Sequence, residues 1–382
     1  MRISIITSAR ADFGLLKNLI LEIKKEKKFL TSVIASGSHY TKQFGDTSKE
    51  IIKNKIKIDK KILFKSISDN ENSISKIFGK CVENSTKIFK SLRPDLLIVL
   101  GDRYEILASV ISANFLKIPV AHIHGGELTY GAIDDAFRHS ITKMSHVHFT
   151  AHQTYKKRII QLGENPKNVH VVGGLGIESI NKTKFLSKSE LEKKYKLSFK
   201  KKNLIVCFHP ETINKFSPKK QIREVLSALK VLKNTLIIFT MPGADLGNNI
   251  IKKEIKKFTK IKKDSFFYAS LGQRNFFSFL NQVDAIIGNS SSGILEMPYF
   301  QKATINLGTR QMGRLHSKSI VNVKINKSDI LRSIKLIYSP KFKKDIKNSK
   351  NFYGDGGSSK RILRILKKLN TKNLFQKRFF NY

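Results

Sequence analysis

Short apolar runs alternate along the chain with apolar positions at helical spacing. In the first half this pattern predicts strands over 3–8, 31–36, 95–100, 119–123, 146–149 and 168–172. It predicts helices between them near 13–28, 41–53, 73–91, 104–116, 135–144 and 153–162. The run at 95–100 is apolar throughout, which is typical of a parallel strand buried on both faces. Such βα alternation predicts a doubly wound sheet.

The second half of the chain repeats the pattern. Strands are predicted over 204–208, 236–240, 265–269, 285–288 and 303–307, and helices over 219–233, 273–282, 292–300, 327–337 and 359–369. A Gly-rich stretch and a charged segment separate the halves, so a boundary is expected near 177–200. We therefore expect an α/β protein with two αβα domains, 1–180 and 181–360, followed by a basic tail, 361–382. Ligands of such sheets bind beyond the carboxyl ends of the strands, which predicts a site in a cleft between the domains.

The charge of the chain is extreme but evenly spread. Its 382 residues carry 72 Lys+Arg against 29 Asp+Glu, a formal net charge of +43. Lysines occur in nearly every segment and form no single stripe with interleaved aromatics, so we interpret the charge as compositional bias and expect no nucleic-acid partner. A basic surface would still attract a polyanionic ligand. The tail has apolar spacing suited to a helix, which favours packing on the first domain over lying on an anionic membrane.

Targeting and metal-binding signals are weak. No apolar run approaches the ~18 residues of a membrane span, and the first residues read as a buried strand rather than a signal peptide, so a cytoplasmic protein is expected. The two cysteines, Cys81 and Cys207, are too far apart in sequence to suggest a disulfide framework or a Cys-rich metal site. His122/His124 and His146/His148 have strand spacing that invites a metal hypothesis. Without an HExxH motif we expect no metal.

Acidic residues follow two of the predicted strands. Asp102 comes directly after the strand at 95–100, and Glu127 closes the segment HIHGGE after the strand at 119–123. Both could therefore lie on one wall of a site and serve as acid and base. Asp134 and Asp135 follow closely, and one of this pair is expected to cap the helix after it. The alternative for Asp102 is also a capping role.

Phosphate-binding candidates follow strands of both halves. Ser290 and Ser291 stand between a strand and a helix, where free N–H groups and hydroxyls bind anions, although a simple helix cap is the alternative. Arg10 and Arg314 follow other strands and could neutralise a diphosphate, unless they are surface charges. His209, at a strand end, is a candidate substrate contact. No GxGxxG or GxxxxGK[ST] motif occurs, which argues against a dinucleotide-binding dehydrogenase and a P-loop ATPase.

Several of these segments together resemble one family. The chain is similar to the UDP-N-acetylglucosamine 2-epimerases, specifically the hydrolysing branch that makes N-acetylmannosamine for sialic-acid synthesis. The matching segments, which are ordered as in that family and span about 1–360, are TSARADFGLL (7–16), SGSHYTKQFG (36–45), GDRYE (101–105), HIHGGE (122–127), IDDAFRHSITKMSH (133–146), FHPET (208–212), GNSSSGILE (288–296) and LGTRQMGR (307–314).

The resemblance implies a GT-B type fold of two Rossmann-like domains, a C-terminal helix that returns to the first domain, and a homo-oligomer, dimer or tetramer. It implies elimination of the nucleoside diphosphate to a glycal, then hydration with inversion at carbon 2, with no cofactor. It carries Asp102, Glu127 and the Asp134/Asp135 pair over as acid–base candidates, without assigning which removes the proton. It carries over to the nucleotide and its phosphates His209, Ser290, Ser291, Glu296, Arg10 and Arg314.

Other functions remain open on the sequence alone. The same chemistry could act on a UDP- or GDP-linked 2,4-diacetamido-2,4,6-trideoxyhexose for legionaminic acid synthesis. A non-hydrolysing epimerase, a glycosyltransferase of the same fold and a basic nucleic-acid-binding protein are further alternatives. The residues that distinguish one sugar from another are not visible in one sequence.

Overall fold

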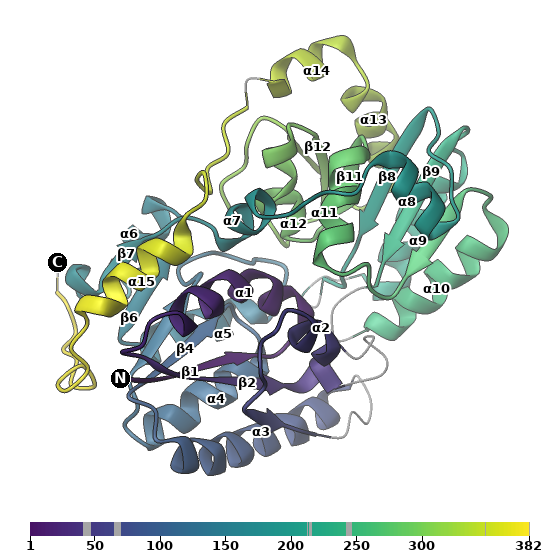
Figure 1. The fold of residues 1–382 in the computed structure, drawn as a ribbon. Helices are drawn as coiled ribbons and strands as arrows, with labels where there is room; N and C mark the ends of the chain where they lie inside the picture. The colour runs from purple at the N-terminus through teal and green to yellow at the C-terminus, as the bar shows by residue number, and fades with distance from the viewer. Residues whose placement is uncertain are drawn as a thin grey trace. The chain divides into compact units, whose positions relative to one another are not determined.

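The chain divides into two compact units. In this computed structural model the described residues are 1–40, 47–64, 70–211, 213, 216–241, 247–347 and 349–381. Unit 1 comprises 1–127, 134–181 and 353–382, and unit 2 comprises 128–133 and 182–352 (Figure 1). Two segments differ from the expected division. Residues 128–133 group with unit 2, and residues 353–382 group with unit 1 instead of ending the second domain and forming a separate tail.

Unit 1 is built on a seven-stranded parallel sheet in the order β3-β2-β1-β4-β5-β6-β7. Its strands are β1 (Arg2–Thr7), β2 (Leu30–Ser36), β3 (Lys60–Ile62), β4 (Leu96–Leu100), β5 (Val120–Ile123), β6 (Val147–Thr150) and β7 (Val169–Val171). The strand order reverses between β1 and β4, which is the doubly wound arrangement predicted from the sequence. All five residues of β4 are buried, as its apolar run indicated.

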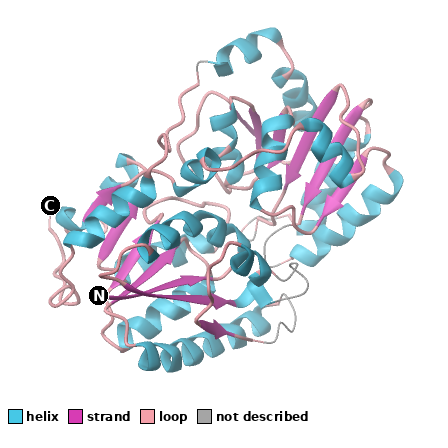
Figure 2. Cartoon of the chain, in the orientation of Figure 1, coloured by secondary structure: helices cyan, strands magenta, loops and turns pink. Residues whose placement is uncertain are grey.

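Along the chain, helices alternate with the strands of unit 1 (Figure 2). They are α1 (Arg10–Lys24), α2 (Ser48–Lys53), α3 (Glu71–Leu92), α4 (Tyr104–Phe115), α5 (Asp134–Met144), α6 (Gln153–Gln161), α7 (Leu175–Asn181) and α15 (Ser358–Lys368), with 3-10 turns η1 (Gly37–Tyr40) and η3 (Pro166–Asn168). The expected helix near 41–53 is seen as α2, and its part at 41–46 lies outside the described residues, as does part of the segment 36–45. Among the described residues, two large apolar clusters form the core, and a smaller one joins α6 to β7. One large cluster joins α1 and α15 to the sheet, and the other joins α3 and α4 to it.

The basic C-terminal segment packs on unit 1. Ile362 and Leu366 of α15 are buried in the same cluster as Leu16 and Leu19 of α1. Beyond the helix, the Phe375 ring stacks on His146 with 4.9 Å between ring centroids. The structure thus agrees with the expectation that the apolar spacing of this segment packs against the first domain.

Unit 2 contains a six-stranded parallel sheet in the order β10-β9-β8-β11-β12-β13. Its strands are β8 (Lys202–Cys207), β9 (Thr235–Thr240), β10 (Ser265–Tyr268), β11 (Ala285–Gly288), β12 (Ala303–Leu307) and β13 (Ile320–Val323). Its helices are α8 (Lys188–Tyr195), α9 (Pro218–Lys230), α10 (Asn248–Ile261), α11 (Gln273–Gln282), α12 (Ser292–Leu295), α13 (Lys327–Ile337) and α14 (Pro340–Lys347), with the 3-10 turn η4 (Met297–Phe300). Apolar residues of β8, β9, β11 and β12 pack against α9, α10 and α13 in one core.

One expected helix is interrupted. The region predicted as a helix over 292–300 is a single α-helical turn, α12, followed by η4. Pro298 stands in the first turn of η4, where it has no N–H to donate to a continuing helix and its ring crowds the residue before it. The helix after the Ser-rich turn is therefore only four residues long.

Candidate active site

The sheet of unit 1 brings the two predicted acidic segments together. β4 and β5 are neighbours, with Leu100 opposite Ile123, and the Gly101 N–H donates to the Ile123 carbonyl at 3.0 Å. The residues that follow these strands, Asp102 and His124, therefore start from the same edge of the sheet. This is the juxtaposition expected from parallel strand ends.

A buried arginine of α5 connects these segments. Arg138 Nη2 donates to Asp102 Oδ2, and Nη1 donates to the carbonyl oxygen of His124 at 2.9 Å. The same Nη1 lies 3.7 Å from Glu127 Oε2. Because one guanidinium pairs with two carboxylates, it holds Asp102 and Glu127 in one charged cluster. Arg138 was not among the residues predicted from the sequence. The signal available was a basic residue one helical turn before the buried Ile141.

The segment after β5 makes a tight turn that pairs an imidazole with a carboxylate. His124 Nδ1 and Glu127 Oε1 are 2.6 Å apart. Gly126 has a φ of +75°, and a Cβ there would come within 2.5 Å of the Tyr155 carbonyl oxygen, so the turn requires glycine at this position. Glu127 is fully buried, whereas the Asp102 side chain is 21% exposed. Of the two predicted carboxylates, Asp102 is therefore the more accessible.

His122 has a structural role beneath this cluster. Its Nε2 lies 2.8 Å from the Gly101 carbonyl oxygen, and its Nδ1 lies 3.1 Å from Thr142 Oγ1. A carbonyl can only accept, so Nε2 carries the hydrogen and Nδ1 accepts from the threonine hydroxyl. Complete burial lowers the pKa of His122 to about 3, which keeps the ring neutral. His122 thus ties the end of β4 to α5.

Asp134 and Asp135 lie within the first turn of α5 rather than before it. One of them was expected to be the capping residue, and both are instead helical. Carboxylates are stabilised in a first turn by the unpaired N–H groups and the helix dipole. Asp135 Oδ2 lies 3.6 Å from His139 Nε2, one turn further along the same helix.

Arg10 is the first residue of α1, after the end of β1. The turn before it is organised by Asp12, which accepts hydrogen bonds from the Ser8 N–H at 2.8 Å and from Thr7 Oγ1 at 2.7 Å. Thr7 Oγ1 also lies 3.0 Å from Nε2 of His39, whose pKa is lowered by burial. Asp12 therefore fixes the backbone from which Arg10 extends.

In unit 2, side chains connect the ends of the adjacent strands β8, β11 and β12. The Asn289 amide accepts from the His209 N–H at 2.7 Å and donates to the His209 carbonyl at 2.9 Å. Glu211 Oε1 accepts from the N–H groups of Thr309, at 2.6 Å, and Arg310, at 2.9 Å. Thr212, the last residue of FHPET, lies outside the described residues. These contacts hold His209 at the edge where β8 and β11 end.

The other predicted nucleotide contacts of unit 2 lie around the same strand ends. Ser290 Oγ is 3.4 Å from the Ser292 N–H, and the Ser291 carbonyl accepts from N–H groups of α12. Arg314 donates to the Gln311 side chain at 2.7 Å, and Gln311 in turn donates to the Asn289 carbonyl at 2.9 Å. Glu296 is buried directly after α12. Ser290 and Ser291 therefore lie between β11 and α12, Glu296 follows α12, and Arg314 is connected to the end of β11 through Gln311.

The described residues contain neither a cluster of metal ligands nor a membrane-spanning helix. Within the ranges given above, no group of three His, Cys, Asp or Glu side chains is arranged to hold a metal ion. No helix of the described chain combines the length and the apolar character that a membrane crossing requires.

Comparison with known proteins places these observations in context. The family model described as UDP-N-acetylglucosamine 2-epimerase matches residues 21–367. GDP/UDP-N,N'-diacetylbacillosamine 2-epimerase (hydrolyzing) of Campylobacter jejuni is 38% identical, with 100% of this chain and 99% of that protein covered. Polysialic acid biosynthesis protein P7 of Escherichia coli is 35% identical over 100% of this chain and 97% of its own length. UDP-N,N'-diacetylbacillosamine 2-epimerase (hydrolyzing) of Legionella pneumophila is 32% identical, with 96% of this chain and 95% of that protein covered.

The fold also matches solved structures. UDP-GlcNAc 2-epimerase from Neisseria meningitidis, solved with UDP-GlcNAc bound, aligns with a TM-score of 0.84 and 20% identity over 97% of this chain and 100% of that one. This likeness is one of fold, and it agrees with two Rossmann-like units of GT-B type. With a family match over most of its length and full-length relatives above 30% identity, the chain belongs to the UDP-N-acetylglucosamine 2-epimerase family.

Proposed function

We propose that the protein is a hydrolysing 2-epimerase of a UDP- or GDP-linked 2,4-diacetamido-2,4,6-trideoxyhexose. Its products would be the nucleoside diphosphate and the free sugar with inverted carbon 2. Two full-length relatives named as hydrolysing diacetylbacillosamine 2-epimerases support this substrate over UDP-N-acetylglucosamine. The substrate expected first from the sequence, UDP-N-acetylglucosamine, is the second candidate, and the description of the matching family favours it.

The observation that carries the chemistry is the charged cluster around Arg138. Elimination needs a base for the carbon 2 proton, and hydration of the glycal needs an acid that delivers a proton to carbon 2. Inversion requires these two transfers on opposite faces of the sugar, so two groups must act. The cluster offers Asp102 and the Glu127–His124 pair from adjacent strand ends. Asp134 and Asp135, on the helix that carries Arg138, complete the set of acid–base candidates.

We assign the nucleotide to side chains that follow other strands. Ser290 and Ser291 would donate hydroxyl hydrogen bonds to phosphate, and Glu296 would accept from ribose hydroxyls. His209, Arg10 and Arg314 would bind the diphosphate and stabilise its negative charge as it leaves. Since these cations and donors assist the leaving group, the proposed reaction needs no cofactor. We also infer that the protein is cytoplasmic and forms a homo-oligomer, either a dimer or a tetramer. Light scattering of the purified protein would test the oligomeric state.

The test is proton NMR in deuterated water with three substrates: UDP- and GDP-linked N,N'-diacetylbacillosamine, and UDP-N-acetylglucosamine. We expect release of nucleoside diphosphate with a diacetamido substrate, and a free sugar carrying deuterium at an inverted carbon 2. Faster turnover of UDP-N-acetylglucosamine would move the assignment to the second candidate. Inversion without nucleotide release would refute the hydrolysing assignment, and no reaction with any of the three would refute the proposal as a whole.

Variants connect this reaction to the cluster. Replacing Asp102 with Asn removes an acid–base group while keeping its size, and we expect a loss of about 10²–10⁴-fold in kcat. The matched control is Asp345→Asn, at an exposed position of α14. An Asp102→Asn enzyme as active as this control would show that the carboxylate takes no part in the chemistry.

A further inference from the structure

We propose that His124 is a catalytic residue, whose Nε2 exchanges a proton with carbon 2, and that Glu127 is a positioning residue acting through it. This inference rests on the proposed function and assigns separate roles, proton transfer and positioning, to the two residues of the Glu127–His124 pair. From the sequence, His124 was part of a metal hypothesis only, and Glu127 was one of several acid–base candidates.

The hydrogen bonds of His124 fix which ring nitrogen is available. Nδ1 lies 2.6 Å from Glu127 Oε1, and an ionised carboxylate accepts hydrogen bonds but cannot donate them. The hydrogen of a neutral ring is therefore on Nδ1, and Nε2 carries the lone pair of a base. A carboxylate that orients a histidine in this way also stabilises the imidazolium that forms when the base accepts a proton.

The nitrogen left available is buried and has no partner in the described part of the chain. His124 is only 5% exposed, and its Nε2 makes no hydrogen bond to any described residue. A buried polar atom without a hydrogen bond costs free energy, so folded proteins rarely retain one without a ligand or water to satisfy it. The group that would satisfy Nε2 is one that offers it a proton.

The backbone of His124 is strained. Its φ is +64°, in the left-handed region that non-glycine residues rarely adopt. The conformation is held from both sides, because the His124 N–H donates to the Phe149 carbonyl at 3.0 Å and the His124 carbonyl accepts from Arg138 at 2.9 Å. Strain of this kind is concentrated at functional sites, where a side chain must be aimed at a fixed point.

Elimination and hydration each transfer one proton at carbon 2. Nε2 takes the carbon 2 proton, the electron pair of that C–H bond forms the carbon 1–carbon 2 double bond, and the carbon 1–oxygen bond breaks with its pair leaving on the diphosphate. In hydration, a second group, for which Asp102 is the candidate at this edge, delivers a proton to the opposite face of carbon 2. Water adds its oxygen to carbon 1 and returns a proton to that group. The imidazolium then releases its proton to solvent.

The experiment compares His124→Gly, Glu127→Gln and a matched histidine control, His170→Gln, at a half-exposed position of the same sheet. Each is assayed with the nucleotide-linked sugar that the wild-type protein turns over fastest. We expect His124→Gly to lose about 10²–10⁴-fold in kcat, with recovery on adding imidazole that increases with the basicity of the imidazole derivative. Its melting temperature should stay within about 3 °C of wild type, because glycine relieves the left-handed strain.

Glu127→Gln distinguishes positioning from direct contact. We expect its kcat to fall by about 10²-fold or more with KM changed less than threefold, because the carboxylate orients His124 and does not touch the substrate. A His124→Gly enzyme within threefold of the control, or one that no added base restores, would overturn the catalytic role of His124. A wild-type protein that turns over none of the substrates would instead refute the proposed function, and this inference with it.

Discussion

In the described part of unit 1, two buried histidine–glutamate pairs have their histidines at the neighbouring strands β5 and β6, and their surroundings differ. His124 and Glu127 follow β5, whereas His148 lies on β6 with its Nε2 3.1 Å from Glu164 Oε2. Both histidines are buried and both carboxylates are nearly inaccessible. The two pairs therefore contain the same chemical groups at similar depth.

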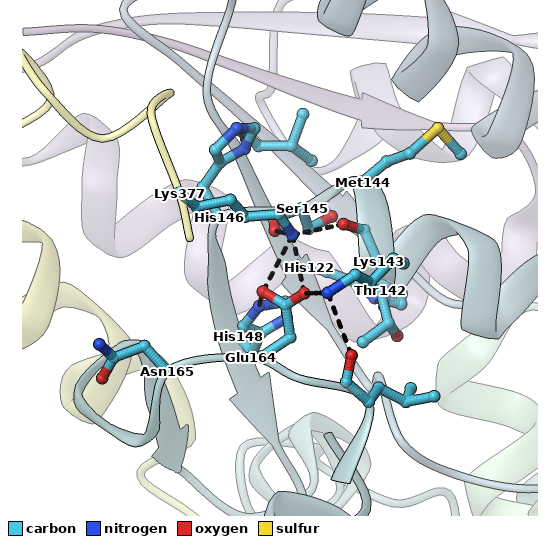
Figure 3. Close-up of polar contacts among 12 residues, drawn as sticks. His122, Thr142, Lys143, Met144, Ser145, His146, His148, Glu164, Asn165 and Lys377 are labelled. Carbon is cyan, nitrogen blue, oxygen red and sulfur yellow. Dashed lines mark hydrogen bonds and ion pairs between the residues drawn. The ribbon is translucent and has the colours of Figure 1, made fainter. Parts of the chain in front are cut away.

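The neighbouring charges separate the two pairs. Glu164 accepts from Lys377 Nζ at 2.8 and 2.9 Å and from Lys143 Nζ at 3.0 Å (Figure 3). Burial acts to raise the pKa of Glu164, but the hydrogen bonds from His148 and Lys377 outweigh it and lower the pKa to about 2. Burial also lowers the pKa of His148, with Lys377 and Lys143 adding to the effect. Because two lysine ammonium groups already pair with the single Glu164 carboxylate, protonation of His148 is disfavoured.

The Glu127 pair has the opposite balance. Among its named charged groups one guanidinium, Arg138, serves two carboxylates, Asp102 and Glu127. An imidazolium formed at His124 would stand beside two carboxylates and the Arg138 guanidinium, whereas one formed at His148 would stand beside one carboxylate and two ammonium groups. A buried His–Glu pair is therefore a stronger candidate for proton transfer where its neighbours include a second carboxylate than where they are additional lysines.

The largest expected effect comes from replacing Arg138 with Met. This change leaves Asp102 and Glu127 without their shared cation, and breaking a buried ion pair costs about 3–5 kcal/mol of unfolding free energy. We also expect kcat to fall by about 10³-fold or more, because the cluster loses its geometry. Urea unfolding and nucleotide release measure the two effects, with Arg332→Met, at an exposed position of α13, as the control. Retention of a tenth of wild-type activity would mean that the cluster is not the site.

The second effect separates stability from activity. Replacing Lys377 with Met should lower the unfolding free energy by about 2–3 kcal/mol, since its side chain is 24% exposed and its loss leaves Glu164 buried beside fewer cations. We expect kcat to change less than threefold. Lys372→Met, in the exposed part of the same segment, is the matched control. A strong loss of kcat in the Lys377 variant alone would contradict the structural role given to the Glu164 pair.

Acid should destabilise unit 1 through its neutral histidines. Burial lowers the pKa of His146 to about 4, so between pH 6.5 and 4 the unfolded chain binds a proton that the folded chain does not. Stability must therefore fall as pH decreases through this window, by up to about 1.4 kcal/mol per pH unit for each such histidine. The low pKa of Glu164 extends the loss from about pH 4.5 downward. Urea midpoints across this range should show a shallower slope for His146→Gln than for wild type, and equal slopes would exclude His146 as a contributor.

The smallest effect tests exposure within the second pair. Lys143 also binds Glu164, but its side chain is 42% exposed. Surface ion pairs are worth about 0.2–1 kcal/mol, so Lys143→Met should cost less than Lys377→Met by at least about 1 kcal/mol. The same urea experiment measures both variants. Equal costs would show that burial does not distinguish the two lysines.

The sequence predicted the parts of this site that follow from local pattern. Continuous apolar runs located β4 and β5, and the parallel arrangement then placed Asp102 and the HIHGGE segment at one edge. Arg138 was missed because one buried arginine cannot be recognised among 72 basic residues. The helix α10 was also missed, since its buried Ile251 and Ile255 stand among lysines that obscure the apolar stripe.

Contacts between distant parts of the chain were beyond local pattern. Lys377 and Glu164 are 213 residues apart, and nothing near either residue indicates the other. The positive φ of His124 was equally invisible, because non-glycine residues rarely adopt this conformation and no local pattern marks His124 for it. The contact that stabilises the Glu164 pair and the backbone conformation of His124 thus both depend on tertiary structure.

The discontinuity of unit 1 has a consequence for biosynthesis. Residues 353–382 belong to this unit, and α15 completes the apolar cluster that contains β1 and α1. A ribosome synthesises β1 and α1 before the segment 182–352 and α15 after it, so the core of the first unit cannot close until that segment of unit 2 has been made. Unit 2 is nearly continuous, and its segment 182–352 emerges earlier than that closing helix. We expect chaperones to bind the first unit of the unfinished chain, and chains stopped before residue 353 to be degraded rather than to accumulate as half-enzymes.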